Sequence, residues 1–166
     1  MKSLTQQLAN YALYHRDKRN IYTHFVGIPM IVFAIVILLS KPALLVLDVT
    51  ITPATVIACV TCLYYLRLSL SIGVVMSVLF SLAVIGATPF AAMQTTHWLG
   101  WGIGLFVVGW VFQFVGHFFE GKKPAFVDDL IGLIIGPLFV VVEVLFMLGL
   151  YKSLENDIVE IAGPTH

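Results

Sequence analysis

Side chains that can bind a metal ion or move a proton gather in two short stretches of an otherwise apolar chain. The first stretch contains His15, Asn20 and His24, and the second contains Gln113, His117, Glu120 and Asp128. Polar and ionisable groups are costly beside hydrocarbon, so a chain of this kind retains few of them without a structural or chemical role. Three neutral imidazoles with a carboxylate are typical ligands of ferrous iron, zinc or manganese, and with open positions they suit non-haem iron and oxygen chemistry.

The spacing of these residues predicts how they could converge. Gln113, His117 and Glu120 follow the i, i+4, i+7 pattern, which places them on one face of a helix. His15 and His24 are nine residues apart and would point in opposite directions on one continuous helix. A break at residues 17–20 would allow both rings to meet. We expect the carboxamides of Asn20 and Gln113 to orient the ligands from behind.

Each of these residues also has a structural interpretation. The histidines could cap helix ends or bind backbone carbonyls, and Glu120 could pair with a nearby lysine or with Arg19. Lys122 and Lys123 suit a helix C-terminus at an anionic membrane surface. His97 is 20 residues before His117, roughly 30 Å away at about 1.5 Å per helical residue, and is excluded from the shared site.

The composition indicates an integral membrane protein. Of the 166 residues, 60% are hydrophobic and only 11% are charged, and the formal net charge is zero, which gives no electrostatic basis for nucleic-acid binding. We predict an all-α membrane bundle of about five spans within a single domain, residues 1–152, followed by a polar, frayed tail at 153–166. The expected elements are an interfacial amphipathic helix at 1–16, with Asn20 capping the next helix, and spans near 21–40, 53–66, 68–92, 97–119 and 130–151.

Positive charges predict the orientation of these spans. With the N-terminus inside, seven lysines and arginines fall on the cytoplasmic side and two on the outer side. The three histidines His15, His24 and His117 then lie at the inner leaflet. The membrane would be the inner membrane in a bacterium or the endoplasmic reticulum in a eukaryote.

Two segments resemble a known family. YHRDKRNIYTHFVGIP (14–29) and GWVFQFVGHFFEGKKPAFVDDL (109–130) are similar to motifs of the 2-hydroxy fatty acid dioxygenases, and the similarity extends in order over nearly the whole chain. The resemblance implies an Fe(II)-dependent enzyme that uses O2 to convert a long-chain 2-hydroxy fatty acid to the acid one carbon shorter. The family's histidines fall on His15, His24 and His117. Its other motif residues fall on Asn20, Gln113, Pro124, Asp128 and Glu143.

The resemblance leads to a hypothesis for the mechanism. The three histidines hold iron, Glu120 or Asp128 is a further ligand, and the substrate's carboxylate and 2-hydroxyl chelate the metal. The acyl chain lies among the spans, and Arg19, Lys122 or Lys123 attracts the carboxylate. Two other classes remain open: a bis-histidine haem protein for electron transfer, and a non-enzymatic transporter or assembly factor. A homo-oligomer is also left open.

Overall fold

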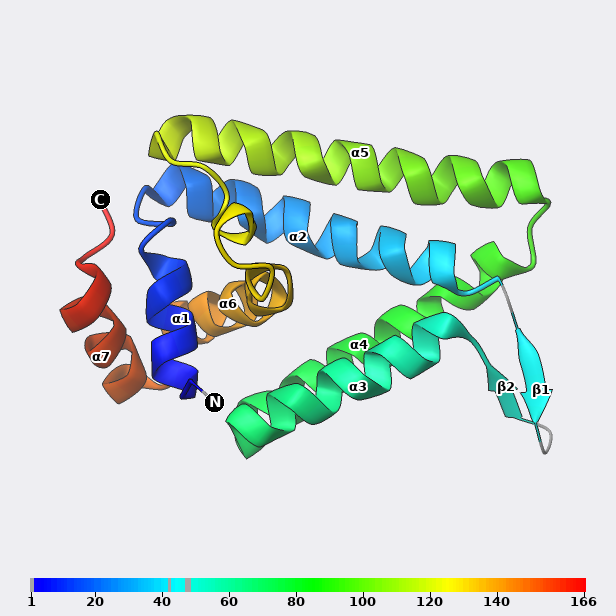
Figure 1. Ribbon diagram of the computed structural model, residues 1–166, viewed down its shortest axis with the longest axis horizontal. Coiled ribbons are helices and arrows are strands. Elements are labelled where there is room, and N and C mark those ends of the chain that lie inside the picture. Colours follow the sequence, from blue (N-terminus) through cyan, green and yellow to red (C-terminus); the bar gives the residue numbers. More distant parts are fainter. Residues whose placement is uncertain (1, 42, 47–48) are drawn as a thin grey trace. The chain divides into compact units, whose positions relative to one another are not determined.

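The chain folds almost entirely into helices (Figure 1). The computed structural model describes residues 2–41, 43–46 and 49–166. The elements are α1 (Leu4–Ala12), α2 (Lys18–Leu39), β1 (Leu44–Val46), β2 (Val49–Ile51), α3 (Pro53–Leu68), α4 (Leu70–Ala91), α5 (Thr95–Glu120), the 3-10 turn η1 (Ala125–Val127), α6 (Gly132–Met147) and α7 (Lys152–Ala162). The predicted all-α fold is confirmed, with one short antiparallel hairpin, β1–β2, added to it.

The contacts divide the chain into two compact units. One contains Met1–Pro29 and Trp110–His166, and the other is Met30–Gly109. The boundaries fall within α2 and α5. The single domain expected over residues 1–152 stays a prediction.

In the first unit, α1 packs against both α6 and α7 (Figure 1). A capping box begins α1, because Ser3 accepts a hydrogen bond from the Gln6 backbone while the Gln6 side chain accepts one from Ser3. The expectation of a frayed tail was wrong, since residues 152–162 form α7 and bury Ile158. Because most residues of this segment are polar, the sequence pattern did not predict the burial of Ile158.

The break between α1 and α2 lies earlier than predicted. α1 ends at Ala12 and α2 begins at Lys18, so His15 lies in the connecting segment and not on a helix. Asp17 holds the beginning of α2, because its carboxylate accepts a hydrogen bond from the Arg19 backbone. Asn20 is inside the helix, and its expected capping role is corrected.

The second unit is organised by the antiparallel pair α3 and α4. Thr52 caps α3 with Pro53 in its first turn, as the sequence predicts. Gly73 permits the close approach of the two helices, since a Cβ there would lie 2.6 Å from the Leu66 backbone. Packing of Ile37 and its neighbours forms the core of this unit.

Among the residues that the structure describes, three helices are long and apolar enough to cross a membrane: α2, α4 and α5. α6 and α7 pass the same test only together, as a pair bent by 118°. α3, with 16 residues, is shorter than the roughly 20 that a bilayer requires. The described residues thus give three spans, or four if the bent pair is one, against about five expected. α6 stops early because Gly149 and Tyr151 adopt positive φ values and turn the chain.

Candidate metal centre

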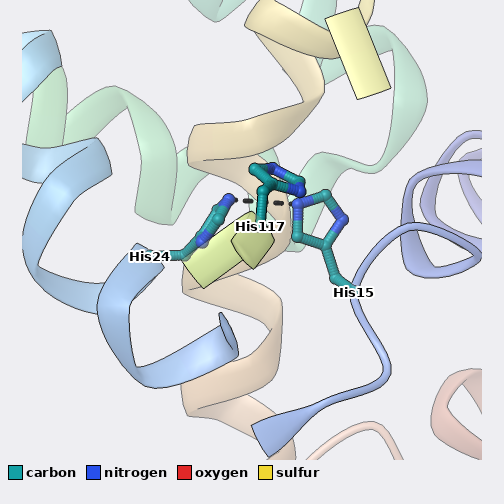
Figure 2. Close-up of side chains that lie close together, drawn as sticks. All are labelled: His15, His24 and His117. Carbon is teal, nitrogen blue, oxygen red and sulfur yellow. Dashed lines mark hydrogen bonds between the residues drawn. The ribbon is translucent and has the colours of Figure 1, made fainter. Parts of the chain in front are cut away.

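Three buried histidines meet inside the first unit (Figure 2). His15 comes from the segment between α1 and α2, His24 from α2, and His117 from α5. One ring nitrogen of each lies within 4.8 Å of the others. Their exposed fractions are 0%, 1% and 6%, so protein and not bulk water surrounds them. The structure therefore brings together the three rings that the sequence singled out.

Tyr11 holds His15 in two ways. Its backbone carbonyl lies 2.7 Å from Nδ1 of His15, and its ring stacks on the imidazole at 4.1 Å between centroids with 3° between planes. Phe139 of α6 contacts both rings, with centroids 5.0 Å from Tyr11 and 5.6 Å from His15. The imidazole of His15 is consequently fixed even though its backbone is not helical.

The hydrogen bonds of His15 and His24 assign their tautomers. A carbonyl oxygen only accepts, so the Nδ1 atom beside each carbonyl carries the proton: His15 donates to Tyr11, and His24 donates to the carbonyl of Asn20 at 2.8 Å. Burial, and then the neighbouring His24, lowers the pKa of His15 well below its usual range. His15 is therefore neutral near pH 7, and its Nε2 presents a lone pair.

The two Nε2 atoms face each other at 3.0 Å. With both protons on Nδ1, neither Nε2 has a hydrogen to donate, so two lone pairs repel at this distance unless a cation lies beside them. The separation matches neighbouring ligands on one ion with metal–nitrogen bonds of about 2.1 Å. The donor set therefore fits a divalent metal ion.

His117 completes the group from α5. Its Nδ1 is buried and has no hydrogen-bond partner among the described residues, which leaves a third nitrogen available. Gly116 allows α5 to approach α2 here, because a Cβ at this position would lie 2.1 Å from Oγ1 of Thr23 and 2.4 Å from Oδ1 of Asn20. A larger residue would separate His117 from the other two histidines.

Glu120 lies beside this group but outside it. Its carboxylate accepts hydrogen bonds from the backbone N–H groups of Arg16, at 2.9 and 3.0 Å, and of Asp17, at 2.9 Å. It also accepts one from Nδ2 of Asn20 at 3.0 Å. Glu120 thus anchors the segment that carries His15. Asn20 links Glu120 to His24, because its side-chain amide donates to Glu120 and its backbone carbonyl accepts from Nδ1 of His24.

Gln113 and Asp128 occupy different surroundings. Gln113 is buried one turn before His117, with no partner for its Nε2 among the described residues. Asp128 is outside the histidine group: it accepts a hydrogen bond from the Tyr14 hydroxyl at 2.7 Å and pairs with Lys123. The Lys123 and Tyr14 contacts lower the pKa of Asp128.

The three cations predicted to attract a carboxylate all have partners. Arg19 pairs with Asp17 at 2.7 Å and lies over the ring of Phe119. Lys122 donates to the carbonyl of Leu13 at 2.8 Å, and Lys123 binds Asp128 as described. Each of these contacts engages a group other than the three histidines.

Arg16 is a buried residue that the sequence reasoning overlooked. Its guanidinium donates to the carbonyls of Ala12 and His15, and to that of Gly163 at 2.7 Å. The backbone of His166 also bonds with the backbone of residues 16 and 18. Residues 163–166 therefore tie down the segment carrying His15. The position of Arg16 directly after the candidate ligand His15 was the sequence feature that could have identified it.

Comparison with known proteins agrees with this arrangement. A family model described as "2-hydroxy-palmitic acid dioxygenase Mpo1-like" matches residues 1–148, which include all three histidines. A protein of Saccharomyces cerevisiae described as 2-hydroxy-palmitic acid dioxygenase MPO1 is 33% identical over 162 residues, covering 93% of this chain and 89% of its own length. No solved structure matches the chain.

Proposed function

This chain belongs to the Mpo1-like family of 2-hydroxy-palmitic acid dioxygenases, and on this premise we propose that it is a membrane-bound, Fe(II)-dependent dioxygenase. Its substrates would be O2 and a long-chain 2-hydroxy fatty acid, and its product the fatty acid one carbon shorter. The proposed iron ligands are His15, His24 and His117.

The facing lone pairs of His15 and His24 are the observation that carries the proposal. Both Nδ1 protons are committed to backbone carbonyls, so the two Nε2 lone pairs, 3.0 Å apart, suit a cation that both rings share. The unpartnered Nδ1 of His117 adds a third donor. Three imidazoles leave positions open for substrate and O2, which suits non-haem iron.

Ferrous iron, when bound, would supply the oxygen chemistry and the affinity for the substrate's oxygen atoms. The chain's own residues do the remaining work. Tyr11 and Asn20 fix the tautomers of two ligands through their carbonyls. Glu120 holds the segment that carries His15, acting as a positioning residue. Burial of all three rings excludes bulk water.

The geometry favours a single ion over a haem. A haem with two axial histidines requires a porphyrin between their rings. Here the ring centroids are 4.6 Å apart for His15 and His24, 4.9 Å for His15 and His117, and 5.1 Å for His24 and His117. These separations leave no room for a porphyrin.

The charge distribution supports the orientation with the N-terminus in the cytoplasm. The candidate metal centre would then lie at the cytoplasmic leaflet, at the inner membrane in a bacterium or the endoplasmic reticulum in a eukaryote. Measurement of the accessibility of single cysteines introduced at Lys2 and Lys122 tests this, since both should react only from the cytoplasmic side.

The test of the function combines metal content with product analysis. Purified protein loaded with Fe(II) should convert 2-hydroxypalmitate to pentadecanoic acid in the presence of O2, while His24→Ala and His117→Ala should lose both iron and product. His97→Ala is the matched control, because His97 is exposed at the beginning of α5 and should affect neither. Iron-loaded protein that leaves 2-hydroxypalmitate intact refutes the proposal, and a Soret band in the purified protein would favour the haem alternative.

A further inference from the structure

A cavity in the first unit lies next to the histidine group. It has a volume of about 220 Å³ and lies between α1 and the segment from η1 to the first turn of α6. Asn10 and Tyr11 line it from α1, Tyr14 lines it from the segment after α1, and Gly132 and Ile135 line it from α6. All of these residues belong to one compact unit.

Tyr11 connects this cavity to the candidate metal centre. Tyr11 lines the cavity, and its ring stacks on the imidazole of His15 at 4.1 Å between centroids. Ile135 lines the cavity one turn before Phe139, which contacts both rings. Tyr11 therefore contacts both the cavity and the imidazole of His15.

The chemistry of the cavity favours a hydrocarbon chain over a charged group. The charges at its rim are paired: Lys2 lies 3.9 Å from Asp129, and Asp128 binds Tyr14 and Lys123. The rim therefore offers little attraction to a carboxylate. Its inner wall includes the apolar side chain of Ile135, which is 2% exposed.

The mouth of the cavity continues into an apolar surface. Val127, Leu130 and Ile131 are 55%, 74% and 42% exposed on the segment that forms one edge. The cavity is smaller than the roughly 300 Å³ at which pockets begin to enclose a drug-sized ligand. A long chain would thus have only one part inside, while its remainder lies along this apolar surface and the surrounding lipid.

We propose that this cavity holds the acyl chain of the 2-hydroxy fatty acid, and that the Tyr11 ring separates it from the metal centre until substrate binds. This inference rests on the proposed function for the identity of the substrate. It assigns to Tyr11 a positioning role and to Asn10 a place where chain binding can be altered without touching a metal ligand.

The experiment is a series of substitutions at Asn10: alanine, leucine and phenylalanine. Asn10 is exposed and lines the cavity, so a larger side chain there should narrow it without disturbing the core. The same series at Asn156, an exposed residue of α7 outside the cavity, is the matched control. Binding of 2-hydroxypalmitate is measured by equilibrium dialysis, alongside iron content and turnover.

We expect Asn10→Phe to weaken 2-hydroxypalmitate binding about tenfold, with iron content unchanged and the Asn156 variants like wild type. The loss should increase from alanine to leucine to phenylalanine and appear in KM more than in kcat. Unchanged binding throughout the Asn10 series would overturn the proposal, as would wild-type protein that binds no 2-hydroxypalmitate. If binding follows the series but no variant, wild type included, turns the substrate over, the cavity assignment is supported and the dioxygenase function fails. If wild type and all Asn10 variants turn the substrate over normally and bind it equally well, the dioxygenase function is supported and the cavity assignment fails.

Discussion

Replacement of Glu120 by glutamine should weaken iron binding, although Glu120 is not one of the proposed ligands. The carboxylate accepts hydrogen bonds from the backbone N–H groups of Arg16 and Asp17, and from the Asn20 amide. Glutamine keeps the shape but offers one oxygen, and its NH2 group must face a donor. The segment that carries His15 then loses part of its anchor.

The structure sets the size of the effect. A hydrogen bond to a charged group contributes about 1.5–3 kcal/mol, and a buried donor left without a partner costs about 1–3 kcal/mol. Loss of charge on Glu120 and of at least one of its bonds should lower the free energy of unfolding by about 3 kcal/mol. Removal of partners that orient metal ligands typically reduces metal affinity about 10–100-fold, and we expect a loss in this range.

Two measurements test this prediction: iron affinity by competition with a chelator, and thermal unfolding in detergent. Glu160→Gln is the control, because it makes the same change on an exposed face of α7. Glu120→Asp keeps the charge and should fall between wild type and Glu120→Gln. If Glu120→Gln binds iron and unfolds as wild type does but loses turnover, the carboxylate acts in the chemistry and the positioning argument is wrong.

Three further predictions follow from the same contacts. Gly116→Ala should separate α5 from α2, because the added Cβ would lie only 2.1 and 2.4 Å from side-chain atoms of α2. The unfolding temperature and the iron content should fall together. Elemental analysis that shows full iron content would contradict this. Removal of residues 163–166 frees Arg16 and the segment beside it, so iron affinity should fall while circular dichroism shows the helix content retained, and unaltered affinity would show that these residues are dispensable. Lys123 and Tyr14 lower the pKa of Asp128 below its ordinary value of 3.8, so its contribution to stability is present above pH 4 and lost as the pH falls through the lower, folded-state pKa. In Asp128→Asn, the free energy of unfolding should fall less than in wild type as the pH is lowered below 4. An equal fall in both proteins would show that other carboxylates cause the loss of stability in acid.

Much of the candidate site could be predicted from the sequence because helical periodicity is a local property. The spacing of His117 and its neighbours placed them on one helix face before any tertiary contact was known. The apolar composition predicted a membrane protein, and the motifs around residues 14–29 and 109–130 predicted the family that the comparisons then identified.

Other features could not be read from local patterns. The connection between α1 and α2 lies at 13–17 because Glu120, more than 100 residues away, binds the backbone there. The polar tail forms a helix because α1 offers a surface against which Ile158 is buried. In both places a long-range partner decides the local conformation, and the local sequence does not encode that partner.

The sequence by itself determined which side chains could hold a metal ion: His15, His24 and His117 are rare polar groups in an apolar chain. Only the tertiary structure decided which of their nitrogens are available. That choice depends on the carbonyls of Tyr11 and Asn20, which take up the Nδ1 protons and leave two Nε2 lone pairs 3.0 Å apart. The tertiary structure likewise decided where the Glu120 carboxylate binds, because it accepts hydrogen bonds from the backbone of Arg16 and Asp17 in the segment that carries His15.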